Sequence, residues 1–551
     1  MKKIYASLLL CCAINFVNAQ WTSDRKQNTL VANANASDIQ TANTNDGRTW
    51  IAFYTQRGNN YDMRAQLLNA NGERMLGDSG VLVSDKQSGS ATFVFNVCVD
   101  KENNLIVAFQ FLKNGNYQCV IQKINTAGKR LWDGGVKLGA GLSPYPVTLA
   151  TNKIAVAWNN NNKIDYQIIN PSGTTAWATY KEYAANGVSR PQLLANTNGG
   201  FSTVYQSLVY FPFYTNLYEQ RFDSTGNTVW SAPSKISSLT TASYRYFDVH
   251  IDNDSTYVGY YGNPSGSNRF DAYVQKINPN GVVRWGTNGS AFANYSGEND
   301  PYEQTIYITK DKTTNNVWAV CTITNSLQTS SGISVQKFDG HTGSRYFDAN
   351  GKVVLPISPK LISLAFCQLS LCNAEPLFLA TDNSNALTAI KLNTSGDKAW
   401  KYLLRPIATS SNTKFRYGFT DVYNGQAVAV WQEDKGNGDM PYAQNIKCDG
   451  STGSSSNNVI ANTNITNSIS IKNIFPNPVH VILNATIESA AKTSIHIYVT
   501  DVAGNIIKQF QQNISAGANT VQLNLDGVKT GSYFMKVTNE KESAGVIFNK
   551  D

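Results

Sequence analysis

Hydrophobic and polar residues alternate in short runs along most of this chain, and the runs return with a period of about fifty residues. The clearest copy is YVQKINPNGVVRW, residues 273–285. Its alternation predicts a strand, its Asn-Pro-Asn-Gly segment predicts a tight turn, and a second strand follows. The pattern therefore predicts an all-β protein built from repeated hairpins.

Eight copies of this hairpin align on a Gln in the first strand and a Gly in the turn. Pairs six residues apart are Gln66/Gly72, Gln122/Gly128, Gln167/Gly173, Gln220/Gly226, Gln275/Gly281 and Gln444/Gly450. Gln336/Gly343 has one extra residue, and Ile390 replaces Gln in the copy that keeps Gly396. Four residues after the Gly stand Leu76, Trp132, Trp177, Trp230, Trp285, Phe347 and Trp400.

The turn of each copy combines three residue types with separate physical roles. An Asn or Asp three residues before the Gly, such as Asn278, bonds the backbone ahead of it and starts the turn. The Gly supplies the positive φ angle that a short hairpin loop with a bulge requires. The Trp then buries a large apolar face where the next strand begins.

Two further strand-like runs precede each hairpin, for example residues 94–100 and 105–111. Four short antiparallel strands per period are typical of a β-propeller blade, and stacking the blades in a ring buries their faces. The count predicts eight blades, with seven as the alternative. The strand triplets lie near residues 37–70, 91–126, 144–171, 190–224, 244–279, 301–340, 361–394 and 412–449.

Closure of the ring is predicted from two irregular copies. Residues 21–32 resemble the last strand of a blade without the three strands before it. The last copy has the opposite defect, because Ser454 stands where the other copies have Trp or another large apolar residue. We predict that the N-terminal strand completes the last blade. Residues 458–461 are the alternative closing strand.

Residues 1–19 have the pattern of a secretory signal peptide. Lys2 and Lys3 precede an apolar run at residues 4–14, and Val-Asn-Ala at residues 17–19 forms the cleavage site. The apolar run is too short to span a bilayer, and no other segment is a transmembrane candidate. The mature chain is therefore expected to have no membrane span.

Composition adds little evidence of a specific partner. The 551-residue chain has a formal net charge of +8, which falls to about +6 without Lys2 and Lys3. The basic residues are spread singly, which argues against nucleic acid binding. Six cysteines remain after the signal peptide, at spacings that fit no zinc motif, and no disulfide pairing is assigned: Cys98, Cys119, Cys321, Cys367, Cys372 and Cys448.

The pattern changes after the repeat domain, which is expected to cover residues 20–450. Residues 451–468 are rich in Ser, Asn and Thr and predict a linker. Residues 469–551 then show longer alternating strands that predict a small immunoglobulin-like β-sandwich.

This C-terminal segment also carries a set of short motifs: Pro476, Asn477, Pro478, Asp501, Gly504, Gly531, Tyr533 and Lys536. In this combination the segment resembles the type A C-terminal sorting domain of the type IX secretion system. The resemblance implies export across the inner membrane of a Gram-negative cell by the signal peptide. It further implies transport of the folded protein by the type IX secretion machinery, removal of the domain, and release or attachment at the cell surface.

Candidate chemistry is sparse, and no catalytic residue or metal site is predicted. The four His residues are scattered and form no metal-ligand pair: His250, His341, His480 and His496. Acidic residues fall on the loops between second and third strands, where they are expected to be turn formers: Asp62, Asp165, Asp271, Glu433 and Asp439. No cofactor is expected, although Asp252-Asn253-Asp254 and Asn45-Asp46-Gly47 would offer oxygen ligands to calcium.

The strongest binding candidate is the aromatic run at residues 205–218, interpreted as an extended loop between second and third strands. Tyr210, Phe211, Phe213 and Tyr214 are more aromatics than a surface turn requires, and exposed aromatics mark interaction sites. Tyr61 and Arg269 are expected on the same rim. The alternative is that the rings cover a neighbouring blade.

The sequence thus favours an exported β-propeller, at the cell surface or released, that acts as a binding or adhesion module for glycans or proteins. A secreted glycan-active enzyme, with two carboxylates facing across a cleft of the propeller, is the alternative function.

Overall fold

A computed structural model describes residues 21–183, 188–210, 213–241, 247–263, 271–294, 301–365, 368–453, 469–501, 505–539 and 543–551. The chain divides into two compact units, residues 1–455 and 456–551. The expected signal peptide lies outside the described residues, as does the expected linker from residue 454 onward. Every regular element in the described parts of the chain is a β-strand.

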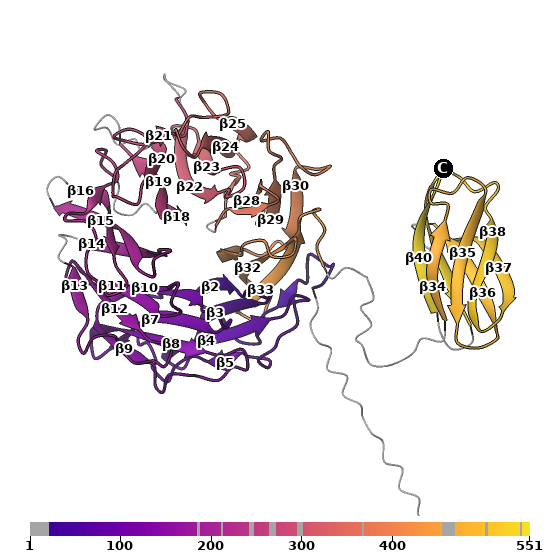
Figure 1. Ribbon diagram of the computed structural model, residues 1–551, viewed down its shortest axis with the longest axis horizontal. Helices are drawn as coiled ribbons and strands as arrows, with labels where there is room; N and C mark the ends of the chain where they lie inside the picture. Colours follow the sequence, from indigo (N-terminus) through magenta and orange to yellow (C-terminus); the bar gives the residue numbers. More distant parts are fainter. Residues whose placement is uncertain are drawn as a thin grey trace, which may run out of the picture. The chain divides into compact units, whose positions relative to one another are not determined.

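Eight antiparallel sheets stand around a ring in the first unit, which confirms the predicted eight-bladed propeller (Figure 1). We number the blades 1 to 8 along the chain. Blade 1 consists of β2 (Ile39–Asn43), β3 (Thr49–Arg57), β4 (Asn60–Leu68) and β5 (Val81–Leu82). Blade 2 consists of β6 (Phe95–Val99), β7 (Leu105–Lys113), β8 (Asn116–Ile124) and β9 (Val136–Ala140). Blade 3 consists of β10 (Leu142–Thr148), β11 (Ile154–Asn160), β12 (Lys163–Ile169) and β13 (Lys181–Tyr183).

The next three blades follow the same strand order, and blade 7 adds a fifth strand, since β26 and β27 both pair with β28. Blade 4 consists of β14 (Val188–Ala195), β15 (Phe201–Tyr210), β16 (Phe213–Phe222) and β17 (Ser234–Lys235). Blade 5 consists of β18 (Asp248–Asp252), β19 (Ser255–Gly262), β20 (Asp271–Ile277) and β21 (Ser290–Ala291). Blade 6 consists of β22 (Tyr302–Lys310), β23 (Asn316–Thr324), β24 (Ser331–Asp339) and β25 (Lys352–Ser358). Blade 7 consists of β26 (Ser363–Leu364), β27 (Ser370–Cys372), β28 (Glu375–Thr381), β29 (Leu387–Lys391) and β30 (Leu404–Ala408).

Blade 8 joins the two ends of the unit. Its strands β31 (Lys414–Phe419), β32 (Gln426–Asp434) and β33 (Asp439–Lys447) come from the end of the repeat domain, and β1 (Thr29–Leu30) completes it. Thr29 pairs with Ala443 and Leu30 pairs with Tyr442. The predicted N-terminal closing strand is confirmed, while the alternative at residues 458–461 lies outside the described residues.

The repeat Trp holds adjacent blades together. The indole of Trp132 in blade 2 lies against Gly173 in blade 3, where a Cβ atom would come within 2.5 Å of the ring. Its Nε1 donates to the carbonyl of Pro171, at 3.2 Å. Trp230 and Trp400 make the same pair of contacts with the turns of blades 5 and 8. The turn Gly is therefore needed for its positive φ angle and for the space that the neighbouring ring occupies.

The repeat Gln fixes the chain segment that carries this Trp. The side chain of Gln275 is fully buried and donates to the carbonyl of Gly286 at 2.8 Å. Its Oε1 accepts from the backbone N–H of Trp285 at 3.1 Å. An amide is suited to this position because it satisfies a donor and an acceptor of the irregular chain after the turn.

One disulfide connects the last two blades. Cys372 at the end of β27 is bonded to Cys448, which follows β33, with a Cα–Cα distance of 5.8 Å. The bond closes a segment of blade 7 onto the end of blade 8. It suits a protein exported to an oxidising compartment.

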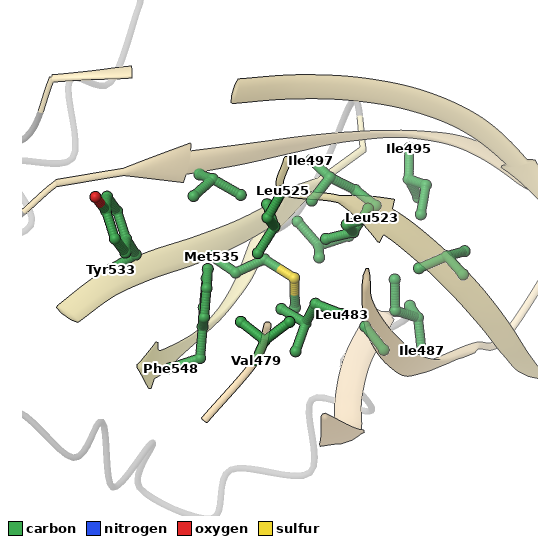
Figure 2. Packing of buried hydrophobic residues seen from close by; sticks show 14 of the residues in the cluster. Val479, Leu483, Ile487, Ile495, Ile497, Leu523, Leu525, Tyr533, Met535 and Phe548 are labelled. Carbon is green, nitrogen blue, oxygen red and sulfur yellow. The ribbon is translucent and has the colours of Figure 1, made fainter. Parts of the chain in front are cut away.

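The second unit is a two-sheet sandwich. One sheet contains β34 (Ile469–Phe475), β35 (Ile482–Ser489) and β38 (Gly517–Asn524). The other contains β37 (Ile506–Ile514), β36 (Thr493–Thr500), β39 (Gly531–Thr538) and β40 (Ser543–Lys550). Alternate residues of both sheets point inward and form one apolar core, with Met535 and Leu483 among its members (Figure 2). The predicted immunoglobulin-like sandwich is confirmed.

Candidate functional site

The propeller has two faces that could present a site. The second strand of each blade runs from the turn after the innermost strand to the hairpin that leads into the third strand. Hairpins of the second and third strands therefore share one face, which we call the hairpin face. Turns between the first and second strands share the opposite face, which we call the inner-turn face.

The aromatic run on the hairpin face is not the loop that the sequence suggested. Strands β15 and β16 continue through it as a regular ladder up to the pair Tyr210–Phe213, and residues 211–212 lie outside the described part. The ladder has seven pairs beyond Thr203–Gln220. The corresponding ladders of blades 1 and 2 have six pairs beyond Ile51–Gln66 and Val107–Gln122, and that of blade 7 has three beyond Phe378–Ile390. The blade 4 hairpin is therefore the tallest in the described part of the ring, by one residue pair.

The base of this hairpin is built from stacked tyrosines. The rings of Tyr205 and Tyr218 are stacked with their centroids 5.9 Å apart, and Tyr183 lies edge-on to Tyr205 at 6.2 Å. Burial raises the pKa of Tyr205 above its ordinary value. Tyr214, nearer the tip, is half-buried. The rings at the base are packing residues, which leaves the upper residues as the candidates for binding.

The remaining predicted rim residues are placed differently. Tyr61 is half-buried and lies edge-on to Phe93, with the ring centroids 4.7 Å apart. Arg269 and Phe211 lie outside the described residues. Tyr61 is thus part of the packing between blades 1 and 2.

Two acidic residues of the hairpin face, Asp62 and Glu433, are engaged by protein cations. Asp62 forms an ion pair with Arg57 at 2.9 Å. Glu433 is fully buried and lies 3.6 Å from the ammonium group of Lys414 and 3.8 Å from that of Lys435. These contacts give both carboxylates a structural role.

Asp165 occupies a more apolar position on the same face. It is almost fully buried and accepts a hydrogen bond from Asn160 at 2.8 Å. Burial raises its pKa above the ordinary value for Asp. Asp271 and Asp439 stand at the first positions of β20 and β33.

The contact between blades 4 and 5 contains a buried carboxyl group that the sequence interpretation missed. Glu219 precedes the repeat Gln220, and the equivalent residue is apolar in the other seven blades: Ala65, Ile121, Tyr166, Val274, Val335, Ala389 and Ala443. Its Oε1 accepts from Thr256 of blade 5 at 2.8 Å, while Oε2 has no hydrogen-bond partner among the described residues. Burial raises the pKa of Glu219 to about 7, against the opposing effects of Thr256, Ser202 and Arg221. Comparing this position between repeats would have identified it.

The inner-turn face has a hollow of about 390 Å³ where the innermost strands of blades 1 to 4 end. Its walls are formed by Asn45, Val99, Asp100, Lys101, Thr148, Leu149, Ala150, Ala195, Asn196 and Thr197. Its acidic group is not free, because Asp100 forms a buried ion pair with Lys123 at 2.7 Å. A second hollow, of about 510 Å³, lies at the outer edge of blades 5 and 6 beside Arg345.

The two segments considered for calcium have carboxylates that already contact protein cations or donors. Asp46 pairs with Arg48 at 2.6 Å, and Asp252 faces Lys310 at 3.4 Å. Asp254 accepts two hydrogen bonds from Thr197. In the described part of the chain, no three His, Cys, Asp or Glu side chains are placed to share a metal ion.

The sorting motif residues lie at turns and strand ends of the second unit. Asn477, between Pro476 and Pro478, accepts a hydrogen bond from the backbone N–H of Asn549 at 2.8 Å. Asp501 accepts from the backbone N–H of Asn505 at 2.9 Å, and Gly504 lies outside the described residues.

Three further motif residues lie on β39. Gly531 opens the strand, and the mostly buried Tyr533 donates its hydroxyl hydrogen to the carbonyl of Lys529 at 2.8 Å. Lys536 is exposed and pairs across the ladder with Tyr498. Of the three, Tyr533 stabilises the turn that precedes the strand.

Residues 473–547 match the family model of the secretion system C-terminal sorting domain. The C-terminal unit is a sorting domain of this family. The domain indicates export by the type IX secretion system, to the cell surface or the medium. Among the described residues, no helix has the length and apolar character needed to cross a membrane.

Similar solved structures include propellers and glycan-active enzymes, all at low identity. A polysaccharide lyase of family PL25, an ulvan lyase bound to a glucuronic acid–sulfated rhamnose disaccharide unit, is 10% identical with a TM-score of 0.44, covering 76% of this chain and 96% of that chain. The Dos1 propeller is 11% identical with a TM-score of 0.42, covering 77% and 95%. The β-propeller domain of the Trilobed protease from Pyrococcus furiosus is 10% identical with a TM-score of 0.36, covering 64% and 92%. No curated protein matches the chain.

Proposed function

We propose that this protein is an exported binding module, and that the tall blade 4 hairpin holds its glycan or protein ligand. The observation that carries the proposal is the ladder from Thr203–Gln220 to Tyr210–Phe213, which raises an aromatic segment on the hairpin face. The hairpin tips of blades 2 and 3 are polar instead, with Asn114-Gly115 and Asn161-Asn162 between the strands. The aromatic residues at this tip are an exception to the repeat, so ring closure does not require them.

The chemistry of this segment suits recognition. Tyr210, Phe211, Phe213 and Tyr214 follow one another at the tip, and aromatic rings provide large contact areas with little loss of side-chain entropy. Flat rings pack on the apolar faces of sugars and on protein surfaces alike. The stacked tyrosines at the base give the hairpin a rigid support, which lowers the entropic cost of binding.

Binding is favoured over glycan cleavage by the state of the acidic groups. An acid–base pair needs two carboxylates that face each other across a cleft. On the hairpin face, Asp62 is tied to Arg57 and Glu433 lies between two ammonium groups. Neither is placed to transfer a proton to a sugar.

A combined glycan and protein array tests the proposal directly. The purified protein should be retained on a restricted group of glycans or partner proteins. Retention should be lost when Phe211, Phe213 and Tyr214 are replaced by Ala. A variant with one replacement at each of three other hairpin tips, Asn59→Ala, Asn114→Ala and Asn161→Ala, provides the matched control and should retain binding. The proposal would be contradicted if the protein were retained on no glycan or protein of the array, or if the aromatic variant and the control variant were retained equally.

A further inference from the structure

The hollow beside Arg345 lies where the outer strand of blade 5 meets the turn of blade 6. Ser290, Ala291 and Asn294 line it from blade 5, and Ser344, Arg345 and Ala349 are among the residues that line it from blade 6. Its volume of about 510 Å³ is in the range of small-ligand sites, and it is open to solvent. A ligand can therefore enter it without a change in the ring.

Arg345 is the charged residue of this lining, and its hydrogen bonds go to carbonyl groups. Its Nη1 donates to the carbonyl of Ala349 at 3.0 Å and makes a longer contact of 3.5 Å with the carbonyl of Ala291. A carbonyl satisfies an N–H group but leaves the positive charge of the guanidinium in place. Among the described residues, no carboxylate forms an ion pair with Arg345.

The equivalent turn of blade 1 makes the same contacts through its Arg. Arg74 stands two residues after its turn Gly, as Arg345 does, and its Nη1 donates to the carbonyl four residues later, that of Asp78, at 3.2 Å. In both turns this carbonyl also accepts a backbone N–H from the neighbouring blade, that of Asn33 at 2.7 Å in blade 1 and that of Asn294 at 2.8 Å in blade 6. The two Arg side chains are therefore held in the same way.

The side chain four residues after the Arg differs between the two turns. In blade 1 it is Asp78, whose carboxylate forms an ion pair with Nη2 of Arg74 at 3.0 Å. In blade 6 it is Ala349, which lines the hollow together with Arg345. The hollow therefore lies next to a guanidinium group whose counterpart in blade 1 binds a carboxylate.

The rest of the lining suits a sugar ring that carries such a carboxylate. Asn294 and Ser344 add an amide and a hydroxyl group, which can bond the hydroxyl groups of a sugar. Phe347 is half-buried and adds an aromatic surface for the apolar face of the ring. A few polar groups beside an apolar surface are typical of small-ligand sites.

From these observations we propose that the hollow beside Arg345 binds the carboxylate group of an acidic sugar unit, such as a hexuronic acid. The carboxylate of the ligand pairs with Arg345 as Asp78 pairs with Arg74 in blade 1. The site is separate from the blade 4 hairpin. It goes beyond the proposed function of the hairpin, and either can be wrong without the other.

Saturation-transfer NMR titrations of the full protein at pH 7 test this site, with methyl glucuronide, methyl glucoside and N-acetylglutamate as probes. Methyl glucuronide should bind, and methyl glucoside should bind about tenfold more weakly or less, because it lacks the charged acceptor for Arg345. N-acetylglutamate has the carboxylates without the sugar ring and should also bind more weakly than the glucuronide. The proposal is wrong if methyl glucuronide gives no signal, or if either of the other probes binds as tightly.

Ala349→Asp is the decisive variant, because it rebuilds in blade 6 the ion pair that blade 1 has. It should weaken binding of methyl glucuronide about tenfold or more, since the new carboxylate occupies Arg345. Ala349→Asn adds a side chain of the same size without the charge and should weaken binding by no more than about threefold. The variant should fold, because Asp78 stands at this position in blade 1. Equal effects of the two substitutions, or unchanged binding in Ala349→Asp, would overturn the proposal.

Removal of the guanidinium gives a second, independent test. Arg345→Gln should abolish the signal of methyl glucuronide and should also lower the melting temperature, because the contact with Ala291 of blade 5 is lost. Arg74→Gln is the matched control, since it removes an Arg that already has a carboxylate partner, and it should leave the signal unchanged. The hairpin triple variant should also retain the full signal. A signal that survives in folded Arg345→Gln would show that the ligand binds elsewhere.

Discussion

The indole ring of Trp21 lies against Gly72, so closely that a Cβ atom on Gly72 would come within 2.5 Å of the ring atom Cδ2. The Nε1 of Trp21 donates to the carbonyl of Ala70 at 2.8 Å. This is the same pair of contacts that Trp132 makes with the turn of the next blade. Trp21 therefore supplies, from the N-terminus, the ring that the last repeat lacks.

Replacing Trp21 should weaken closure of the ring. The side chain is 3% exposed, and removal of a large buried aromatic costs roughly 3–5 kcal/mol. Trp21→Ala should lower the melting temperature by several degrees, and deletion of residues 20–32 should lower it further because β33 loses its partner. Trp21→Phe should have an intermediate effect. An unchanged melting curve for the deletion would contradict closure by this strand.

The space next to the turn Gly can be tested separately from its backbone conformation. Gly72 has a φ of +86° and contacts Trp21, whereas Gly115 has a φ of +78° and nothing within 4 Å of a Cβ atom. Gly115→Ala should cost about 1–2 kcal/mol, the usual penalty for the left-handed region. Gly72→Ala should cost roughly 1–3 kcal/mol more because the ring must move. Equal losses in urea unfolding would show that packing against Trp21 adds nothing.

The ring and its closure could be predicted from the sequence because they rest on spacing. Each turn Gly is followed four residues later by a large apolar residue, usually Trp, and the pair returns about every fifty residues. The last repeat lacks this residue, and Trp21 is the surplus ring that can replace it. The aromatic run was interpreted wrongly as a loop because Pro212 indicates a turn but does not show where the flanking strands end. Only the structure shows that the strand pairing continues up to Tyr210–Phe213.

Contacts between repeats could not be predicted from the sequence, and the reason is physical. The bond between Cys372 and Cys448 depends on how blades 7 and 8 face each other, which neither strand specifies alone. The inner-turn hollow depends in the same way on four blades. Glu219 was recognisable as a charged residue at an apolar position, but its partner Thr256 was not.

The disulfide should stabilise the closed ring. It links residues 76 positions apart, and a loop of this length corresponds to roughly 4 kcal/mol of stabilisation in the chain-entropy description. The double variant Cys372→Ser and Cys448→Ser should unfold at a lower urea concentration than the wild type. Cys98→Ser, at a free cysteine, is the control and should have a much smaller effect. If reduction leaves the unfolding midpoint of the wild type unchanged, the bond contributes nothing.

Glu219 should make the stability of the propeller depend on pH. Burial raises its pKa from 4.5 in the unfolded chain to about 7, so the folded state holds the proton more tightly. Its contribution is most favourable below pH 4.5 and is lost as the pH rises to about 7, by roughly 3 kcal/mol in total. Glu219→Gln should be more stable than the wild type at pH 8, with little difference at pH 4.

The matched control for this prediction is Glu433→Gln. Glu433 is equally buried, but it lies between Lys414 and Lys435, so its removal leaves two ammonium groups without their partner. That variant should be less stable than the wild type at pH 8. A Glu219→Gln variant that is also destabilised at pH 8 would contradict the account of the blade 4–5 contact.

Ligand binding through the blade 4 hairpin is the central claim, and an affinity measurement tests it most directly. The dissociation constant for the best array ligand should be compared between the wild type and the variant with Phe211, Phe213 and Tyr214 replaced by Ala. Binding should weaken on the order of 100-fold or more, as expected for loss of aromatic hot-spot residues, while the melting temperature stays nearly unchanged. An unchanged dissociation constant, or a large drop in melting temperature that places the rings in the core, would contradict the claim.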